Sequence, residues 1–118
     1  MPSKRRAAPD PVDPVVHDGI RYEVVHFGRA LGLKQNGGYL QKLDAESGED
    51  IGFIRIYKVK HRWWRVMEKD KQDVFITDLR LDAARSRLLI DSEQDGHYAY
   101  DIESGEVETV ESVQLRSV

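Results

Sequence analysis

The chain has 118 residues, the size of a single domain. Its net charge of −3 argues against binding nucleic acid or anionic membranes through bulk positive charge. There is no cysteine, which excludes disulfide bonds, thiol catalysis and cysteine-based metal sites. No stretch approaches the roughly 20 apolar residues of a membrane span, and the basic start at Lys4–Arg6 is not followed by the apolar segment of a signal peptide. We therefore expect a cytoplasmic protein without membrane contact.

The first part of the chain is rich in proline. All four prolines lie between Pro2 and Pro14, mixed with basic and acidic residues. Such a composition cannot bury enough apolar surface to order the backbone. It predicts a disordered arm over residues 1–16, followed by a single all-β domain over residues 17–118.

The rest of the chain carries strand signals separated by turn residues. Apolar and charged residues alternate over 20–24, and four glycines over 28–38 predict a loop with one helical turn at 29–33. Further strands are expected over 39–43, 51–59, 74–81, 88–90, 97–102 and 107–113. The stretch 51–59 has apolar side chains on both faces, which is typical of a central strand. The pattern predicts an antiparallel up-and-down meander of about seven strands.

One turn phrase occurs twice. Asp44–Glu49 reads D-A-E-S-G-E and Asp101–Glu106 reads D-I-E-S-G-E. An aspartate at the start of a turn can accept backbone N–H bonds, and a glycine near its end can take positive φ. The residues expected to form these turns are Asp44, Ser47 and Gly48 in the first copy and Asp101, Ser104 and Gly105 in the second.

A third turn is expected before residue 97. The dipeptide Asp95-Gly96 suits the positive-φ centre of a type I′ hairpin turn.

The repeated segments resemble a known blade motif. Tyr39–Glu49 and Tyr98–Glu106 are similar to PQQ-like β-propeller repeats, in which an aromatic-x-x-x-Asp-x-x-(Thr/Ser)-Gly phrase joins two strands. Small uncharacterised bacterial proteins carry the same motif. The resemblance implies two blade-like units, about 20–60 and 74–114, and no particular activity.

Two blades cannot close a propeller, which typically needs four or more. The resemblance therefore implies either two sheets packed face to face or a unit completed by a homo-oligomer through its sheet edges. It implies no quinone cofactor, which needs a many-bladed scaffold and a metal site.

The sequence offers no chemical motif. The histidines His17, His26, His61 and His97 lack metal-ligand spacing, and neither a phosphate-binding loop nor a nucleophile elbow occurs. His26 is a candidate for an interior position, and His97 is a candidate for a pair with Asp95. We predict no catalytic residue, no cofactor and no metal, and a protein that is not an enzyme.

The candidate interaction residues lie in the basic-aromatic segment 58–69, which holds both tryptophans. Tryptophan and arginine are enriched in protein interfaces, and aromatic rings between cations also stack on bases. The tryptophans could instead fill the core, covered by arginine stems. The residues singled out are Arg62, Trp63, Trp64 and Arg65.

Three functions follow from these features. The first is a non-enzymatic module for protein binding or self-assembly. The second is nucleic-acid binding through residues 58–69, which the acidic net charge disfavours. The third is a small-ligand binder with a pocket near His97, Tyr98 and Tyr100. We favour the first.

Overall fold

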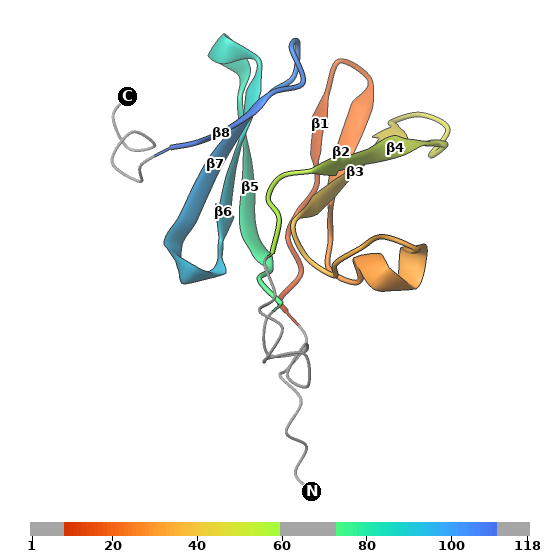
Figure 1. Cartoon of the computed structure of the whole chain (residues 1–118). Coiled ribbons are helices and arrows are strands. Elements are labelled where there is room, and N and C mark those ends of the chain that lie inside the picture. Colours follow the sequence, from red (N-terminus) through yellow and green to blue (C-terminus); the bar gives the residue numbers. More distant parts are fainter. Residues whose placement is uncertain (1–8, 60–72, 111–118) are drawn as a thin grey trace, which may run out of the picture.

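The computed structural model describes residues 9–59 and 73–110, and this part of the chain forms eight strands in two antiparallel sheets (Figure 1). The N-terminal sheet holds, in order, β1 (Val15–His17), β2 (Ile20–Val25), β3 (Tyr39–Asp44) and β4 (Asp50–Arg55). The C-terminal sheet holds β5 (Ile76–Asp82), β6 (Arg87–Ser92), β7 (Gly96–Asp101) and β8 (Val107–Thr109). Short 3-10 helices occupy Gly28–Leu31, Ala83–Arg85 and Glu93–Asp95. The predicted all-β class is confirmed, as two meanders rather than one curled sheet.

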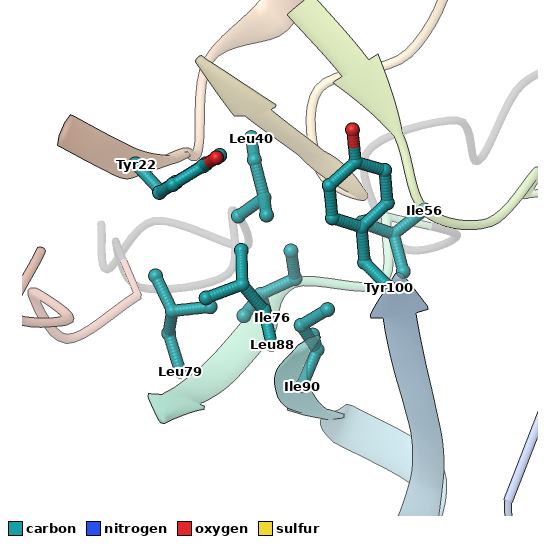
Figure 2. Close-up of a cluster of buried hydrophobic side chains, with 8 residues drawn as sticks. All are labelled: Tyr22, Leu40, Ile56, Ile76, Leu79, Leu88, Ile90 and Tyr100. Atoms are coloured by element: carbon teal, nitrogen blue, oxygen red, sulfur yellow. The ribbon is translucent and has the colours of Figure 1, made fainter. Parts of the chain in front are cut away.

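A hydrophobic core lies between the two sheets, as Figure 2 shows. Side chains alternate between the two faces of a strand, so each sheet has an inner face toward the core and an outer face away from it. Leu40, Leu88 and Ile90 have no exposed surface. The buried residues of the core are Tyr22, Leu40 and Ile56 from the N-terminal half and Ile76, Leu79, Leu88, Ile90 and Tyr100 from the C-terminal half.

The first copy of the repeated turn is held by its aspartate. The Asp44 carboxylate accepts the backbone N–H bonds of Glu46 and Ser47, each at 2.9 Å. The same two N–H groups lower the pKa of Asp44, with Ser47 contributing most. Gly48 takes a φ of 78°, a region that favours glycine, and donates its N–H to the Asp44 carbonyl at 2.8 Å.

The second copy repeats this geometry. The Asp101 carboxylate accepts N–H bonds from Glu103 at 2.9 Å and Ser104 at 3.0 Å, and Gly105 takes a φ of 80°. The serine hydroxyl of each copy accepts one further N–H, from Glu49 or Glu106. One six-residue phrase therefore builds the same turn after β3 and after β7.

The two copies nevertheless present opposite faces to the shared core. Aligning Asp44 with Asp101 places Leu40 opposite His97, and Leu43 opposite Tyr100. Leu40 and Tyr100 belong to the core. Leu43 and His97 alternate with core residues along β3 and β7 and so lie on the outer faces. The sheets are thus stacked like successive units in a series, rather than as a symmetric face-to-face pair.

The N-terminal boundary differs from the sequence expectation. β1 begins at Val15, inside the expected arm, and pairs with β2 through Val15 and Tyr22. Val12, Val15 and Tyr22 pack in or against the core. Apolar residues between the prolines therefore gain enough burial to order this stretch.

The strand expected over 51–59 is shorter and occupies a different place. β4 ends at Arg55 and is an edge strand, not a central one. Beyond it, the buried amide of Gln35 donates to the Tyr57 carbonyl at 2.8 Å and accepts the Val59 N–H at 2.9 Å. A side chain thus satisfies backbone groups that a neighbouring strand would otherwise pair.

The turn before β7 is centred one residue earlier than predicted. Gln94 and Asp95 take positive φ angles of 66° and 60°, whereas Gly96 is extended at −79° and begins β7. Pairing of Ser92 with Gly96 leaves a three-residue loop in place of the two-residue type I′ turn.

Replacing Leu88 by alanine tests the shared core. We expect Leu88→Ala to lower the free energy of unfolding by about 2–5 kcal/mol, because a fully buried leucine loses its contacts and leaves a cavity. Leu89→Ala is the matched control, since Leu89 is the next residue on the outer face and is only partly buried. Denaturant unfolding followed by circular dichroism measures both. Equal losses would contradict the assignment of the faces.

Candidate functional site

The segment favoured by the sequence falls largely outside the described residues. Arg62, Trp63, Trp64 and Arg65 all lie there, and the described part of the segment, Lys58–Val59, begins with an exposed lysine. Their roles in protein or nucleic-acid binding stay predictions from sequence.

The three residues of the predicted ligand pocket do not line one cavity. Tyr98 and Tyr100 face the core, where the Tyr98 ring stacks on Tyr57 at 5.1 Å between centroids. His97 lies on the outer face, because neighbouring residues of a strand point to opposite sides. Its Nδ1 is 2.8 Å from the carboxylate of Asp91, not of Asp95.

The Tyr57 hydroxyl has a structural role. It donates to the Val74 carbonyl at 2.6 Å, and burial is the main cause that raises the pKa of Tyr57. The phenol therefore stays protonated and ties the chain after β4 to the chain before β5.

The outer face of the N-terminal sheet carries an exposed apolar row. Val16 is 56% exposed, Ile51 48% and Phe53 36%, and Leu43 lies between them on β3. The pairings place Val16 beside Arg21, Arg21 beside Leu43 and Leu43 beside Asp50, so the apolar residues are spread across the sheet from β1 to β4 with charged residues between them. We call these four residues, Val16, Leu43, Ile51 and Phe53, the apolar row. Several exposed apolar side chains gathered on one sheet face are a feature of interaction sites.

The other end of the same face is covered by the loop between β2 and β3. Tyr39 lies on this face but is buried, and its hydroxyl accepts the Lys34 N–H at 3.2 Å. Gly28 packs so closely over the Tyr39 ring and the Gln35 carbonyl that no side chain fits there. The loop therefore seals one end of the face and leaves the apolar row open.

The rim of this covering loop is itself apolar. Phe27 and Leu31 are 56% and 55% exposed. Leu31 ends a single 3-10 turn whose N–H and carbonyl groups are tied to the rest of the loop through Gly28 and Asn36. Exposed apolar side chains therefore occur on this ordered loop as well as on the sheet.

The outer face of the C-terminal sheet is charged instead. Arg80 lies 2.8 Å from the Asp78 carboxylate and 3.2 Å from that of Asp91, which also contacts His97. These groups are partly exposed, so the ion pairs contribute little to stability but fix the charges in place. Arg87 pairs with Asp82 at 3.0 Å beside them.

A hollow of about 320 Å³ lies on this charged face, over β6, β7 and β8. Its floor includes Ala99, which is buried although it faces outward. Its walls combine arginine and carboxylate groups and leave no single strong charge for a small ion. The lining residues are Arg85, Arg87, Ala99, Asp101, Glu106, Val107 and Glu108.

His26 lies in a partly buried site with a single hydrogen bond among the described residues. Its Nε2 lies 3.1 Å from the Asp10 carbonyl and must donate, so Nδ1 carries the lone pair; that atom is buried and has no hydrogen-bond partner among the described residues. The ring also meets Phe75 edge-on at 5.5 Å. Burial lowers the pKa of His26, more than the Asp10 carbonyl and Glu93 raise it.

Metal and membrane features were sought in the same ranges. Across residues 9–59 and 73–110, no group of three or more histidine, aspartate or glutamate side chains is placed to hold a metal ion. Within those ranges there is also no helix with the length and apolar character needed to cross a bilayer.

No family model, curated protein or solved structure matches this chain. The case for a function therefore rests on the residues and their geometry.

The buried ring of His26 predicts a pH-dependent stability. Its folded pKa lies below the unfolded value of about 6.5, so the unfolded chain binds more protons and stability falls as the pH drops below about 6.5. Thermal unfolding across this range should show a steeper loss for the wild type than for His26→Gln, which cannot titrate. Parallel curves for the two proteins would contradict the buried neutral ring.

Proposed function

We propose that this chain is a small non-enzymatic domain of the bacterial cytoplasm that binds a protein surface through the outer face of its N-terminal sheet. The observation that carries the proposal is the apolar row, from Val16 on β1 to Phe53 on β4. Burying such side chains contributes roughly 25 cal/mol per Å² of apolar area, which favours a partner over water.

The composition of this face suits a protein partner. Arg21 lies on β2 between Val16 and Leu43 and pairs with Glu23 at 2.6 Å, so a charged residue with a long apolar stem stands among the exposed apolar side chains. Apolar centres with arginine at their borders are common in protein interfaces.

Two of the four edge strands, β1 and β8, are less suited to binding than the face. β1 and β8 have three residues each, and a proline directly precedes β1. Short edges flanked by proline discourage strand addition from another chain. The partner is therefore expected on the face rather than along β1 or β8.

Site-specific cross-linking in cells tests this function. A photoreactive phenylalanine analogue at position 53 should form covalent adducts with a protein, because Phe53 lies within the proposed contact. The same analogue at Ala45, exposed at the tip of the turn after β3, is the control. Adducts are detected as a mass shift on denaturing gels.

The pattern of adducts decides the outcome. Protein adducts at position 53 and none at position 45 support the function. Equal labelling, or no protein adduct at position 53 while the protein is folded and expressed, overturns it.

A further inference from the structure

The two sheets of this chain pack together through their inner faces, which leaves each sheet with an outer face. Through the repeat alignment, these two outer faces correspond to the two inner faces that are in contact. In the repeat alignment, the inner face of the N-terminal sheet corresponds to the outer face of the C-terminal sheet, since Leu40 matches His97. Likewise the inner face of the C-terminal sheet corresponds to the outer face of the N-terminal sheet, since Tyr100 matches Leu43. The two faces that the described residues leave uncovered are therefore of the same two kinds that meet inside the chain.

The two free faces also differ in charge. On the outer face of the N-terminal sheet, four cations of the strands and covering loop stand against two carboxylates, a formal charge of +2: Arg21, Arg29, Lys34 and Arg55 against Glu23 and Asp50. On the outer face of the C-terminal sheet and the rim of its hollow, six carboxylates stand against three arginines, a formal charge of −3 with histidine counted as neutral: Asp78, Asp82, Asp91, Asp101, Glu106 and Glu108 against Arg80, Arg85 and Arg87.

Their shapes and polarities fit in the same sense. The N-terminal outer face projects Ile51 and Phe53, and the C-terminal outer face has a hollow whose floor includes Ala99. An apolar side chain in that hollow would be buried, while the charged walls meet the cations around the apolar row. Pairing either face with a copy of itself would bring surfaces of like formal charge together, +2 with +2 or −3 with −3.

We propose that a second copy of this chain docks head to tail, with its N-terminal outer face, centred on the apolar row, against the C-terminal outer face around the hollow. This inference rests on the proposed function and names the partner as the chain itself. It extends the internal packing, because each new contact repeats the relation between the two sheets of one chain. A head-to-tail contact of this kind continues from copy to copy until a ring closes.

Two interface variants test the pairing. Phe53→Asp places a negative charge in the apolar row, and Glu108→Arg reverses the charge at the rim of the hollow. Each should raise the dissociation constant of the assembly about tenfold or more, since the first removes an aromatic anchor and the second places like charges together. Ala45→Asp and Glu103→Arg make the corresponding charge changes at exposed turn tips and should leave the assembly unchanged.

Mixing the two interface variants separates head-to-tail docking from symmetric docking. Each variant keeps one intact face, so an equimolar mixture regains one wild-type contact per pair. Light scattering coupled to size exclusion should show both variants alone shifted to monomers and the mixture restored to a complex. Recovery in the mixture also demonstrates that both variants are folded.

The other outcomes overturn the inference in distinct ways. A symmetric contact through the N-terminal faces would leave Glu108→Arg assembled, and one through the C-terminal faces would leave Phe53→Asp assembled. A wild-type chain that is monomeric at all concentrations refutes self-docking, while adducts of position 53 with a different protein would still uphold the proposed function. Absence of both self-association and adducts refutes both proposals.

Discussion

The fold depends on the burial of two inner sheet faces against each other. A four-stranded meander with one apolar face cannot bury that face by itself, so each sheet here is stable because the other covers it. Leu40 of one sheet and Leu88 and Ile90 of the other are fully buried in this contact. Because the strand period is two, fixing one face inward fixes the other outward. The positions of the apolar row and of the charged face both follow from this choice.

The loop between β2 and β3 decides how much of one outer face stays open. Gln35 is buried and ties this loop to the chain after β4, while Asn36 donates to the Asp73 carboxylate at 3.1 Å before β5. Gly37 fits against the Val74 carbonyl where any Cβ would collide. These contacts join the loop to both sheets and hold it over Tyr39. β4 ends at Arg55, opposite Tyr39 and beside this loop, while the apolar row toward the other end of the face stays exposed among the described residues.

Local turn chemistry was predictable from the sequence, and the placement of strands within sheets was less so. The Asp-x-x-Ser-Gly phrase predicts the hydrogen bonds of its turn, because the aspartate, serine and glycine that form the turn lie within six residues of each other. By contrast, apolar residues on both faces of 51–56 are compatible with two placements. The segment fits a central strand, and it fits an edge strand with one uncovered face equally well. Only the tertiary order of the strands distinguishes these cases. The sequence did not predict β1, because three residues after a proline are too few to show the alternation of a strand. Their burial also depends on Tyr22 of the neighbouring strand.

The opposite-face relation between the sheets bears directly on how the free faces can be used. A symmetric sandwich would bury equivalent residues on both sides and leave equivalent faces outside, which favours pairing of like with like. Here the outer faces are unlike, one apolar and cationic, the other anionic around a hollow. Pairing two copies of the anionic face would bring together two surfaces of formal charge −3 and would leave every apolar side chain of the row in water. Pairing the unlike faces removes both costs at once, because carboxylates meet cations and the apolar row leaves water. The order in which the two sheets stack inside one chain therefore favours the same order of stacking between the sheets of two chains.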